Sequence, residues 1–300
     1  MHHHLSWLEA GVVGLVQGVS ELFPVSSLGH SVLIPAWVGG SWARDLDVSS
    51  SESPYLAFIV GLHVATAIAL IIYFWRDWVR IIGGLVTSIV RREVRTADQR
   101  LAWLLVLATV PVGIIGLIGE HVIRVHLARP MPTAALLVAN GLVLLAIERY
   151  RRGEPAESEY VDERVSGPES DTRLATLPVA AAVGIGATQI LALGPGISRS
   201  GVTTAGGLLR GMSREDATRF AFLLATPVIL AAGALELGDL AGPLGDGIRP
   251  QVVFGSVLSG VGAYLAVRFL TRYVASRSLR PFGWYCLAGG VASLVWFSVR

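Results

Sequence analysis

Two stretches, one in each half of the chain, interrupt apolar segments with the same order of polar and helix-breaking residues. Each runs from Gln through Pro to a serine pair or Ser-Arg-Ser and then to Gly, with the same Gln-to-Gly spacing in both. The first is Gln17–Gly29 and the second is Gln189–Gly201. Matching Gly/Pro breaks in two halves are typical of membrane proteins built from inverted repeats, whose site lies where the breaks meet. The pattern therefore predicts two related halves with a buried site between them.

The composition supports a membrane location for both stretches. Of the 300 residues, 53% are hydrophobic and 15% are charged, and the mean hydropathy is +0.60. A soluble domain of this length is rarely so apolar. No basic face interleaved with aromatic residues occurs, so nucleic-acid binding is not expected. The single cysteine, Cys286, excludes a disulfide framework. The sequence thus predicts an all-α integral membrane protein.

Six apolar segments have the roughly 20 residues that a helix needs to cross the hydrocarbon core. Each broken stretch predicts a pair of shorter helices that enters and leaves on one side, a re-entrant hairpin. The predicted spans are 55–75, 101–118, 132–149, 218–236, 252–270 and 282–299, and the predicted hairpins are 5–20 with 27–37 and 174–192 with 201–211. Residues 1–149 then form one repeat and 174–300 a second, inverted repeat, joined by a hydrophilic cytoplasmic linker over 150–173.

The arginines predict the orientation. All 24 basic residues are arginine, and 18 of them fall in four segments, 76–100, 149–173, 210–219 and 268–280. Cytoplasmic loops carry an excess of basic residues, so we assign these segments to cytoplasmic loops. Both termini then lie outside, and the first hairpin enters from outside while the second enters from inside. Two full crossings in place of the hairpins would put the loops of the second half on inconsistent sides.

Arg199 is the most costly residue in the chain, because an arginine within the bilayer costs at least ~2.5–3.5 kcal/mol. It needs an anionic partner, and two remain open. A fixed ion pair with Glu21 would tie the two hairpins together. A phosphate is the alternative, since the planar guanidinium binds phosphoryl oxygens bidentately. The hydroxyls of Ser198, Ser200 and Thr203, at the start of a predicted helix, favour the phosphate.

The first stretch holds the other candidate chemical groups. Glu21 could ligate a divalent cation, act as a general base, or remain a protonated acid in a helix interface. Ser26 and Ser27 follow a proline and could cap the next helix. Ser27 could instead be a nucleophile, because His30 lies three residues on, on the same helical face. His63 lies in an apolar span with no polar neighbour in the sequence and is expected to be a satisfied core histidine.

These motifs resemble those of a known family. The stretches that carry the likeness are Gln17–His30, Pro195–Thr203, Gly206–Gly207, Gly211–Arg214 and Phe222–Pro227. They resemble the bacterial undecaprenyl-diphosphatase family, also called the bacitracin-resistance protein family. The similarity covers nearly the whole chain in the length and order of its apolar segments, and both motifs are long and specific.

The resemblance implies a multi-pass enzyme of the bacterial inner membrane with an outward-facing active site. Such an enzyme removes the terminal phosphate of undecaprenyl diphosphate, its lipid substrate, and so regenerates the carrier for peptidoglycan synthesis and confers bacitracin resistance. Membrane lipid is the surrounding partner, and a homodimer is left open. The family requires a divalent cation, which we expect to be Mg²⁺ or Ca²⁺.

Carried over residue by residue, the resemblance implies a metal site at Glu21 and Gln17 and a catalytic set. In this reading Ser27 is the preferred nucleophile with His30 as its proton partner, while attack by water with Ser27 as a phosphate ligand stays open. The implied catalytic residues are Glu21, Ser27, His30 and Arg199, and the implied phosphate-binding residues are Ser26, Ser198, Arg199, Ser200 and Thr203.

The chain departs from the family pattern at two positions. Many members have Glu where this chain has Gln17, so the metal site here has one carboxylate and one amide, which predicts weaker metal affinity. Leu28 stands where a small polar residue is usual, which narrows the pocket. Two other functions remain in view. A transporter of polyprenyl phosphate or another anion would use the same inverted repeats, and the change at Gln17 would suit a catalytically silent homologue.

Overall fold

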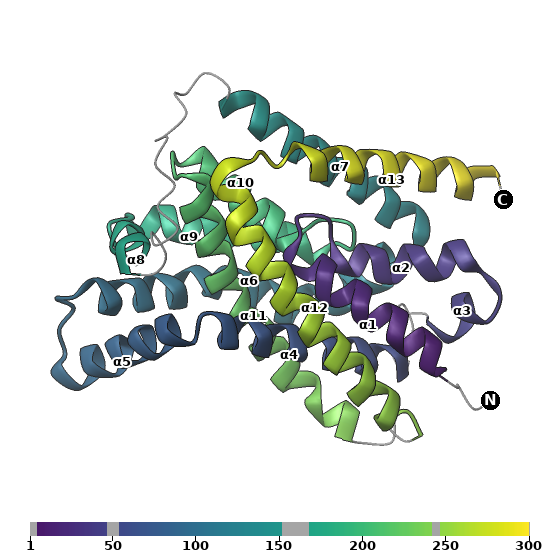
Figure 1. Ribbon diagram of the computed structural model, residues 1–300, viewed down its shortest axis with the longest axis horizontal. Coiled ribbons are helices and arrows are strands. Elements are labelled where there is room, and N and C mark those ends of the chain that lie inside the picture. The colour runs from purple at the N-terminus through teal and green to yellow at the C-terminus, as the bar shows by residue number, and fades with distance from the viewer. Residues whose placement is uncertain (1–4, 47–53, 152–167, 242–246, 300) are drawn as a thin grey trace.

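The computed structural model describes residues 5–46, 54–151, 168–241 and 247–299, and within these ranges all regular elements are helical (Figure 1). The prediction of an all-α protein is confirmed. The elements are α1 (Trp7–Leu22), α2 (Ser27–Val38), α3 (Gly40–Asp45), α4 (Pro54–Tyr73), α5 (Trp75–Arg91), α6 (Ala97–Leu127), α7 (Pro130–Tyr150), α8 (Pro168–Ala175), α9 (Val179–Ala187), the 3₁₀ helix η2 (Thr188–Leu193), α10 (Arg199–Leu209), α11 (Arg214–Ala241), α12 (Arg249–Ser276) and α13 (Arg280–Val299).

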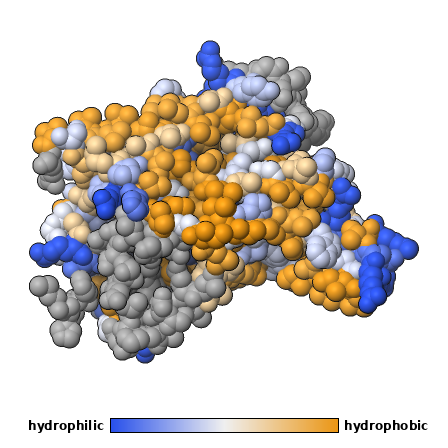
Figure 2. Space-filling view, turned by 180° about the vertical axis from the view of Figure 1, so that it is seen from behind, coloured by the Kyte–Doolittle hydropathy of each residue, from blue (hydrophilic) through white to orange (hydrophobic). Residues whose placement is uncertain are grey.

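Six long helices, α4, α6, α7, α11, α12 and α13, lie at the six predicted spans. Five of them are long and apolar enough to cross a membrane on their own, and α4 meets that criterion together with α5, from which it is bent by 88°. Apolar side chains cover much of the face seen in Figure 2, with hydrophilic residues gathered toward its edges. These features are those of a multi-pass membrane protein.

α5 occupies part of the segment 76–100, so this connection between two spans is helical, not an irregular loop as predicted. Its assignment to the cytoplasmic side stays a prediction. The helix exposes an apolar stripe of residues spaced three or four apart, namely Trp75, Val79, Ile82, Val86, Ile89 and Val90. The arginines of this segment were interpreted as a sign of a loop, and the helical spacing of its apolar residues was therefore overlooked. An amphipathic helix of this kind is typical of the membrane surface, where it lies in the plane of the bilayer.

The two predicted hairpins are present as helix pairs separated by short turns. α1 begins with a capping box, in which the Ser6 hydroxyl accepts from the Glu9 amide and the Glu9 carboxylate accepts from the Ser6 amide. It ends before Pro24, and α2 starts at Ser27. In the second pair, α9 runs into η2 and α10 follows after a five-residue turn. The bounds agree with the prediction to within a few residues.

The segment predicted as a linker, 150–173, is partly structured. Residues 152–167 lie outside the described residues. The last part of the segment forms the start of α8, which is bent by 103° from the helical segment 179–193. Asp171 of α8 is buried and pairs with two arginines, Arg219 of α11 (2.9 Å) and Arg80 of α5 (2.7 Å). Arg219 also pairs with Asp77 at 3.1 Å. These ion pairs hold α5, α8 and α11 together.

The two halves of the chain wrap around each other. Helix α1 packs along α12, α7 packs along α13, and α4 packs against both α11 and α12 (Figure 1). The backbones of α1 and α12 touch at Gly18, where a Cβ atom would lie 2.2 Å from the carbonyl oxygen of Ser259. A residue larger than glycine would force the two helices apart. This interlocking places the turn after α1 against the turn before α10. The repeat boundaries themselves remain a prediction.

Candidate active site

The two breaks that the sequence singled out are in direct contact. A Cβ atom on Gly29 would lie 3.1 Å from the Cα atom of Gly196, so the two turns meet backbone to backbone. Gly196 has φ +109°, a conformation that favours glycine. Its amide donates to the Ser26 hydroxyl at 3.0 Å. Residues 170 positions apart in the sequence are thereby joined at the centre of the molecule.

Asn140 of α7 joins the same two turns. Its side-chain nitrogen donates to the carbonyl oxygen of Pro24 at 3.0 Å, and its side-chain oxygen accepts from the Ser198 amide at 3.0 Å. No sequence motif pointed to this residue, because an isolated asparagine in an apolar span belongs to none. The one indication in the sequence was that a polar amide is costly in a membrane-spanning helix and therefore needs a partner.

Two of the serines predicted to bind phosphate act as helix caps. The Ser26 hydroxyl accepts from the Gly29 amide at 3.2 Å as well as from Gly196, and Ser26 has φ 66°, which is strained for a residue other than glycine. The Ser198 hydroxyl accepts from the Gly201 amide at 3.2 Å and lies 3.1 Å from the hydroxyl of Ser200. Ser26 and Ser198 therefore shape the turns at the starts of α2 and α10.

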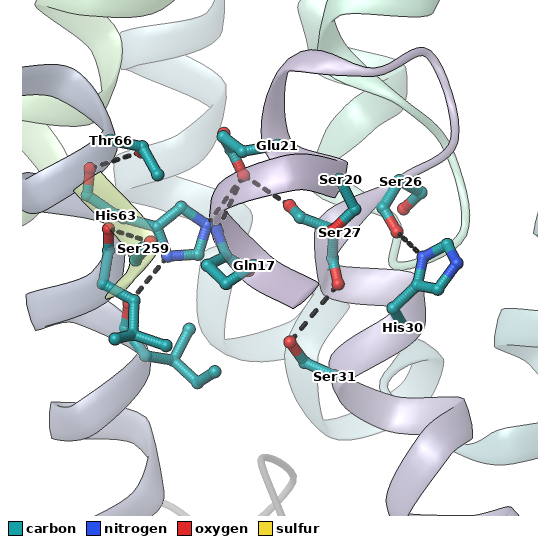
Figure 3. A network of polar contacts seen from close by, with 12 residues as sticks. Gln17, Ser20, Glu21, Ser26, Ser27, His30, Ser31, His63, Thr66 and Ser259 are labelled. Carbon is teal, nitrogen blue, oxygen red and sulfur yellow. Dashed lines mark hydrogen bonds and ion pairs between the residues drawn. The ribbon is translucent and has the colours of Figure 1, made fainter. Parts of the chain in front are cut away.

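Glu21 is the centre of a buried polar network drawn from three helices (Figure 3). Its Oε2 atom accepts a hydrogen bond from the Ser27 hydroxyl, at the start of α2. The same oxygen accepts from Nε2 of Gln17, one turn back on α1, at 2.9 Å. It also lies 3.3 Å from Nε2 of His63 on α4. A serine hydroxyl bonded to a positioned carboxylate is an arrangement that can activate an oxygen nucleophile.

His63 has the satisfied ring that was predicted, but it is part of the Glu21 network and not only a residue of the apolar core. Besides Glu21, the ring contacts the carbonyl oxygen of Ile59 through Nδ1 at 2.9 Å. The contact with Glu21 joins two helices that are far apart in the sequence, and each brings one ionisable residue to it. No spacing rule along a single helix could have found this pair.

His30 does not contact Ser27 as predicted. Both of its ring nitrogens are engaged elsewhere, Nδ1 with the Ser26 carbonyl oxygen and Nε2 with the hydroxyl of Tyr285, each at 2.7 Å. The Tyr285 ring also stacks on His30. The reason is that the Ser27 hydroxyl turns toward Glu21 on α1, whereas the His30 ring turns toward α13. No sequence pattern pointed to Tyr285, since only the packing of α13 brings it to His30.

Arg199 forms no ion pair and no hydrogen bond with other described residues, so the predicted alternative of a fixed Glu21–Arg199 pair does not form. Its Nη1 atom is buried without a partner. The guanidinium nevertheless lies close enough for its charge to act on Glu21 and His63. Arg199 is thus held near the carboxylate network with its donors unused.

Other motif residues share this property. Thr203 and Gln189 are buried, and neither the hydroxyl of Thr203 nor the amide group of Gln189 has a hydrogen-bond partner among the described residues. The amide oxygen of Gln17 is also buried and unpaired. A buried polar group without a partner costs about 1–3 kcal/mol. Several of them in two matching motifs indicate a place that accepts a polar ligand. Gln189 had no predicted role.

An apolar groove begins beside the first turn. It has a volume of about 610 Å³ and lies between α1, α2 and α13. Its walls are mostly aliphatic and aromatic side chains, among them Val16, Val19 and Phe282. The polar exceptions are Ser20, His30 and Tyr285. A groove of this kind suits an apolar chain with a polar end.

The described residues contain no group of three or more His, Cys, Asp and Glu side chains placed to hold a metal. Glu21 and His63 form a pair, with the free amide oxygen of Gln17 beside them. This set offers carboxylate and amide oxygens, which suit hard divalent cations, and one imidazole nitrogen. An unpaired buried oxygen next to a carboxylate fits a cation site better than it fits a closed structural network.

Comparisons with known proteins agree with these motifs. The family model described as "Bacitracin resistance protein BacA" matches residues 10–292. An undecaprenyl-diphosphatase of Mycolicibacterium paratuberculosis is 58% identical over 100% of both chains. Undecaprenyl-diphosphatase 1 of Frankia casuarinae is 48% identical, covering 98% of this chain and 99% of the relative. Undecaprenyl-diphosphatase 2 of Chromobacterium violaceum is 42% identical, with 96% and 98% covered.

Proposed function

The chain belongs to the bacitracin resistance protein BacA family, and we propose that it is an undecaprenyl-diphosphate phosphatase. It hydrolyses the bond between the two phosphates of undecaprenyl diphosphate and releases undecaprenyl phosphate and inorganic phosphate. The observation that carries this proposal is an arginine without an ion pair in the described chain, close enough for its charge to act on a carboxylate that accepts from a serine hydroxyl.

The phosphates bind where donors are left unused. Arg199 and Thr203 have free hydrogen-bonding groups at the start of α10, and the N-terminus of a helix favours an anion. Ser26 and Ser198 hold the two turns in shape, and Ser200 lies beside Ser198. The diphosphate therefore lies between the second turn and the Glu21 network.

Ser27 attacks the terminal phosphorus, and Glu21 is its general base. The Ser27 hydroxyl already donates to Oε2 of Glu21, so its proton passes to the carboxylate as the new P–O bond forms. The bond to the bridging oxygen breaks, and undecaprenyl phosphate leaves with that oxygen. Arg199 neutralises the charge on the transferring phosphoryl group. Gln17 donates to the carboxylate and holds it in place.

Water completes the turnover. Glu21 first gives the proton taken from Ser27 to the phosphate oxygen that leaves with the lipid. A water molecule then attacks the phosphoserine phosphorus and gives a proton to Glu21. The P–O bond to Ser27 breaks, inorganic phosphate leaves, and Glu21 returns the proton to the serine oxygen. Glu21 and Gln17 would hold a divalent cation, for which the unpaired oxygen of Gln17 provides a second oxygen ligand. When bound, such a cation offsets the negative charge of the diphosphate. Mg²⁺ and Ca²⁺ both accept oxygen ligands of this kind.

The apolar groove receives the isoprenoid tail. It opens beside His30 and Tyr285, whose hydrogen bond marks the polar end nearest the first turn. The active site faces the outside of the inner membrane, and both termini lie on that side. The distribution of arginine supports this orientation, because the Arg-rich segments fall at the opposite helix ends.

The proposal is tested by phosphate release from purified protein in detergent. With a polyprenyl diphosphate and a divalent cation, we expect one inorganic phosphate per substrate and a polyprenyl monophosphate as the other product. A transporter would give no net reaction in detergent, where no second compartment exists. Binding of the substrate without release of phosphate would therefore contradict the proposal.

A substitution in the groove tests the position of the tail. We expect Val16→Trp to raise KM for undecaprenyl diphosphate roughly tenfold, because lost burial of two methylene groups costs about 1.6 kcal/mol. A short-chain isoprenyl diphosphate should show little change. The matched control is Val12→Trp, one turn earlier on α1 and exposed outside the groove. Equal changes in KM for long-chain and short-chain substrates would contradict the placement of the isoprenoid tail in this groove.

A further inference from the structure

The orientation of His63 leaves one ring nitrogen available. Its Nδ1 atom lies 2.9 Å from the carbonyl oxygen of Ile59, and since a carbonyl only accepts, Nδ1 carries a proton. Nε2, the other ring nitrogen, points toward Oε2 of Glu21 (Figure 3), and in the neutral tautomer with the Nδ1 proton it is the atom that carries the lone pair. This is the arrangement of metal-binding histidines, which donate their second ring N–H to a backbone carbonyl or carboxylate.

The distance between Nε2 of His63 and Oε2 of Glu21 also fits a shared ion. At 3.3 Å it is longer than the ~2.7–2.9 Å of a charge-assisted hydrogen bond. Nitrogen and oxygen ligands lie about 2.0–2.2 Å from a transition-metal ion, so two ligands of one ion are about 3.0–3.5 Å apart. The two atoms are thus spaced as neighbouring ligands, and the His63 side chain is 19% exposed, so a cation can reach it.

Gln17 supplies a third donor to the same place. Its amide nitrogen binds Glu21, which positions its buried and unpaired oxygen beside the carboxylate. Ser27 and Gln17 both donate to Glu21 and occupy two of the about four lone-pair positions of a carboxylate. The remaining positions can ligate a cation.

We propose that His63 is a ligand of the divalent cation, and that its imidazole makes the site favour Mn²⁺ over Ca²⁺. Imidazole suits transition metals, whereas Ca²⁺ prefers oxygen ligands alone. This inference rests on the cation site of the proposed function and adds a residue from α4 to it. The set has only one carboxylate, because Gln17 provides an amide oxygen. The imidazole nitrogen compensates for the metal affinity that a second carboxylate would have supplied.

Direct measurement of bound Mn²⁺ tests the proposal without substrate. Added to the full-length protein in detergent, Mn²⁺ should show coupling to an imidazole nitrogen in pulsed electron paramagnetic resonance. His63→Leu should lose this coupling and bind Mn²⁺ at least about tenfold more weakly. His63→Gln, which offers an oxygen, should lower the preference for Mn²⁺ over Ca²⁺ by a similar factor. Bound Mn²⁺ without nitrogen coupling in the wild-type protein would overturn the proposal, whatever the variants do.

His126→Gln is the matched control. His126 also contacts a backbone carbonyl four residues earlier through Nδ1, at 2.9 Å from Val122, but forms no ion pair in the part of the chain that the structure describes. Its substitution should leave Mn²⁺ affinity unchanged. Phosphate release is measured separately. Phosphate release with unaltered Mn²⁺ binding in His63→Leu would refute this inference alone, whereas nitrogen-coupled Mn²⁺ without phosphate release would refute the phosphatase function alone.

Discussion

Arg199→Ala is expected to reduce phosphate release by about 10³-fold or more, the range seen when an arginine that stabilises a transferring phosphoryl group is removed. The physical reason is that the site then lacks the positive charge of the guanidinium. The hydroxyl of Thr203 can supply only one hydrogen bond to the phosphates. Arg199→Lys should recover only part of the activity, because an ammonium cannot bind two phosphoryl oxygens in one plane. Steady-state kinetics on a polyprenyl diphosphate measures both variants.

The melting temperature of the same variants separates this role from a structural one. Arg199 makes no ion pair or hydrogen bond with other described residues, so Arg199→Ala should melt at or above the wild-type temperature. A residue that tied the hairpins together would show the opposite result. Arg210→Ala, at the exposed end of the same helix, is the control and should keep full activity. An activity loss below tenfold in Arg199→Ala would contradict the phosphate-binding role.

Glu21→Gln is expected to lower kcat by about 10²–10⁴-fold, the usual contribution of a positioned general base. The amide has nearly the same shape but cannot take the proton of Ser27. Ser27→Ala should cause a loss of similar size, and the double variant should be no worse than either single one, since the two residues act as a unit. Single-turnover kinetics of the three proteins checks this non-additivity.

The control for Glu21 is another buried glutamate on the same helix. Glu9 caps α1 and lies outside the network, so Glu9→Gln should leave kcat unchanged. Losses that simply multiply in the double variant would show that Glu21 and Ser27 act independently. If Ser27→Ala keeps wild-type kcat, attack belongs to water and Ser27 at most positions the phosphate.

The sequence predicted the helices better than the partners of their side chains. The apolar segments were long enough to place all six long helices, and the Pro and Gly breaks placed both hairpins. α5 was missed because its arginines were read as a loop signal, although its apolar residues repeat with the helical period. For the site, Glu21 and Ser27 were both predicted as candidate chemical groups of the first stretch, and they are hydrogen-bonded.

Composition and spacing determined that this chain is helical, belongs in a membrane, and carries two related breaks with costly polar residues. These properties follow from local patterns, since helix period, apolar length and Gly/Pro breaks are each contained in about 20 residues. Only the tertiary structure decided that His63 faces Glu21 and that His30 contacts the hydroxyl of Tyr285. It also decided that Asn140 bridges the turns before α2 and α10. Each of these contacts joins single polar residues on helices distant in the sequence, and their meeting depends on how the two halves interlock.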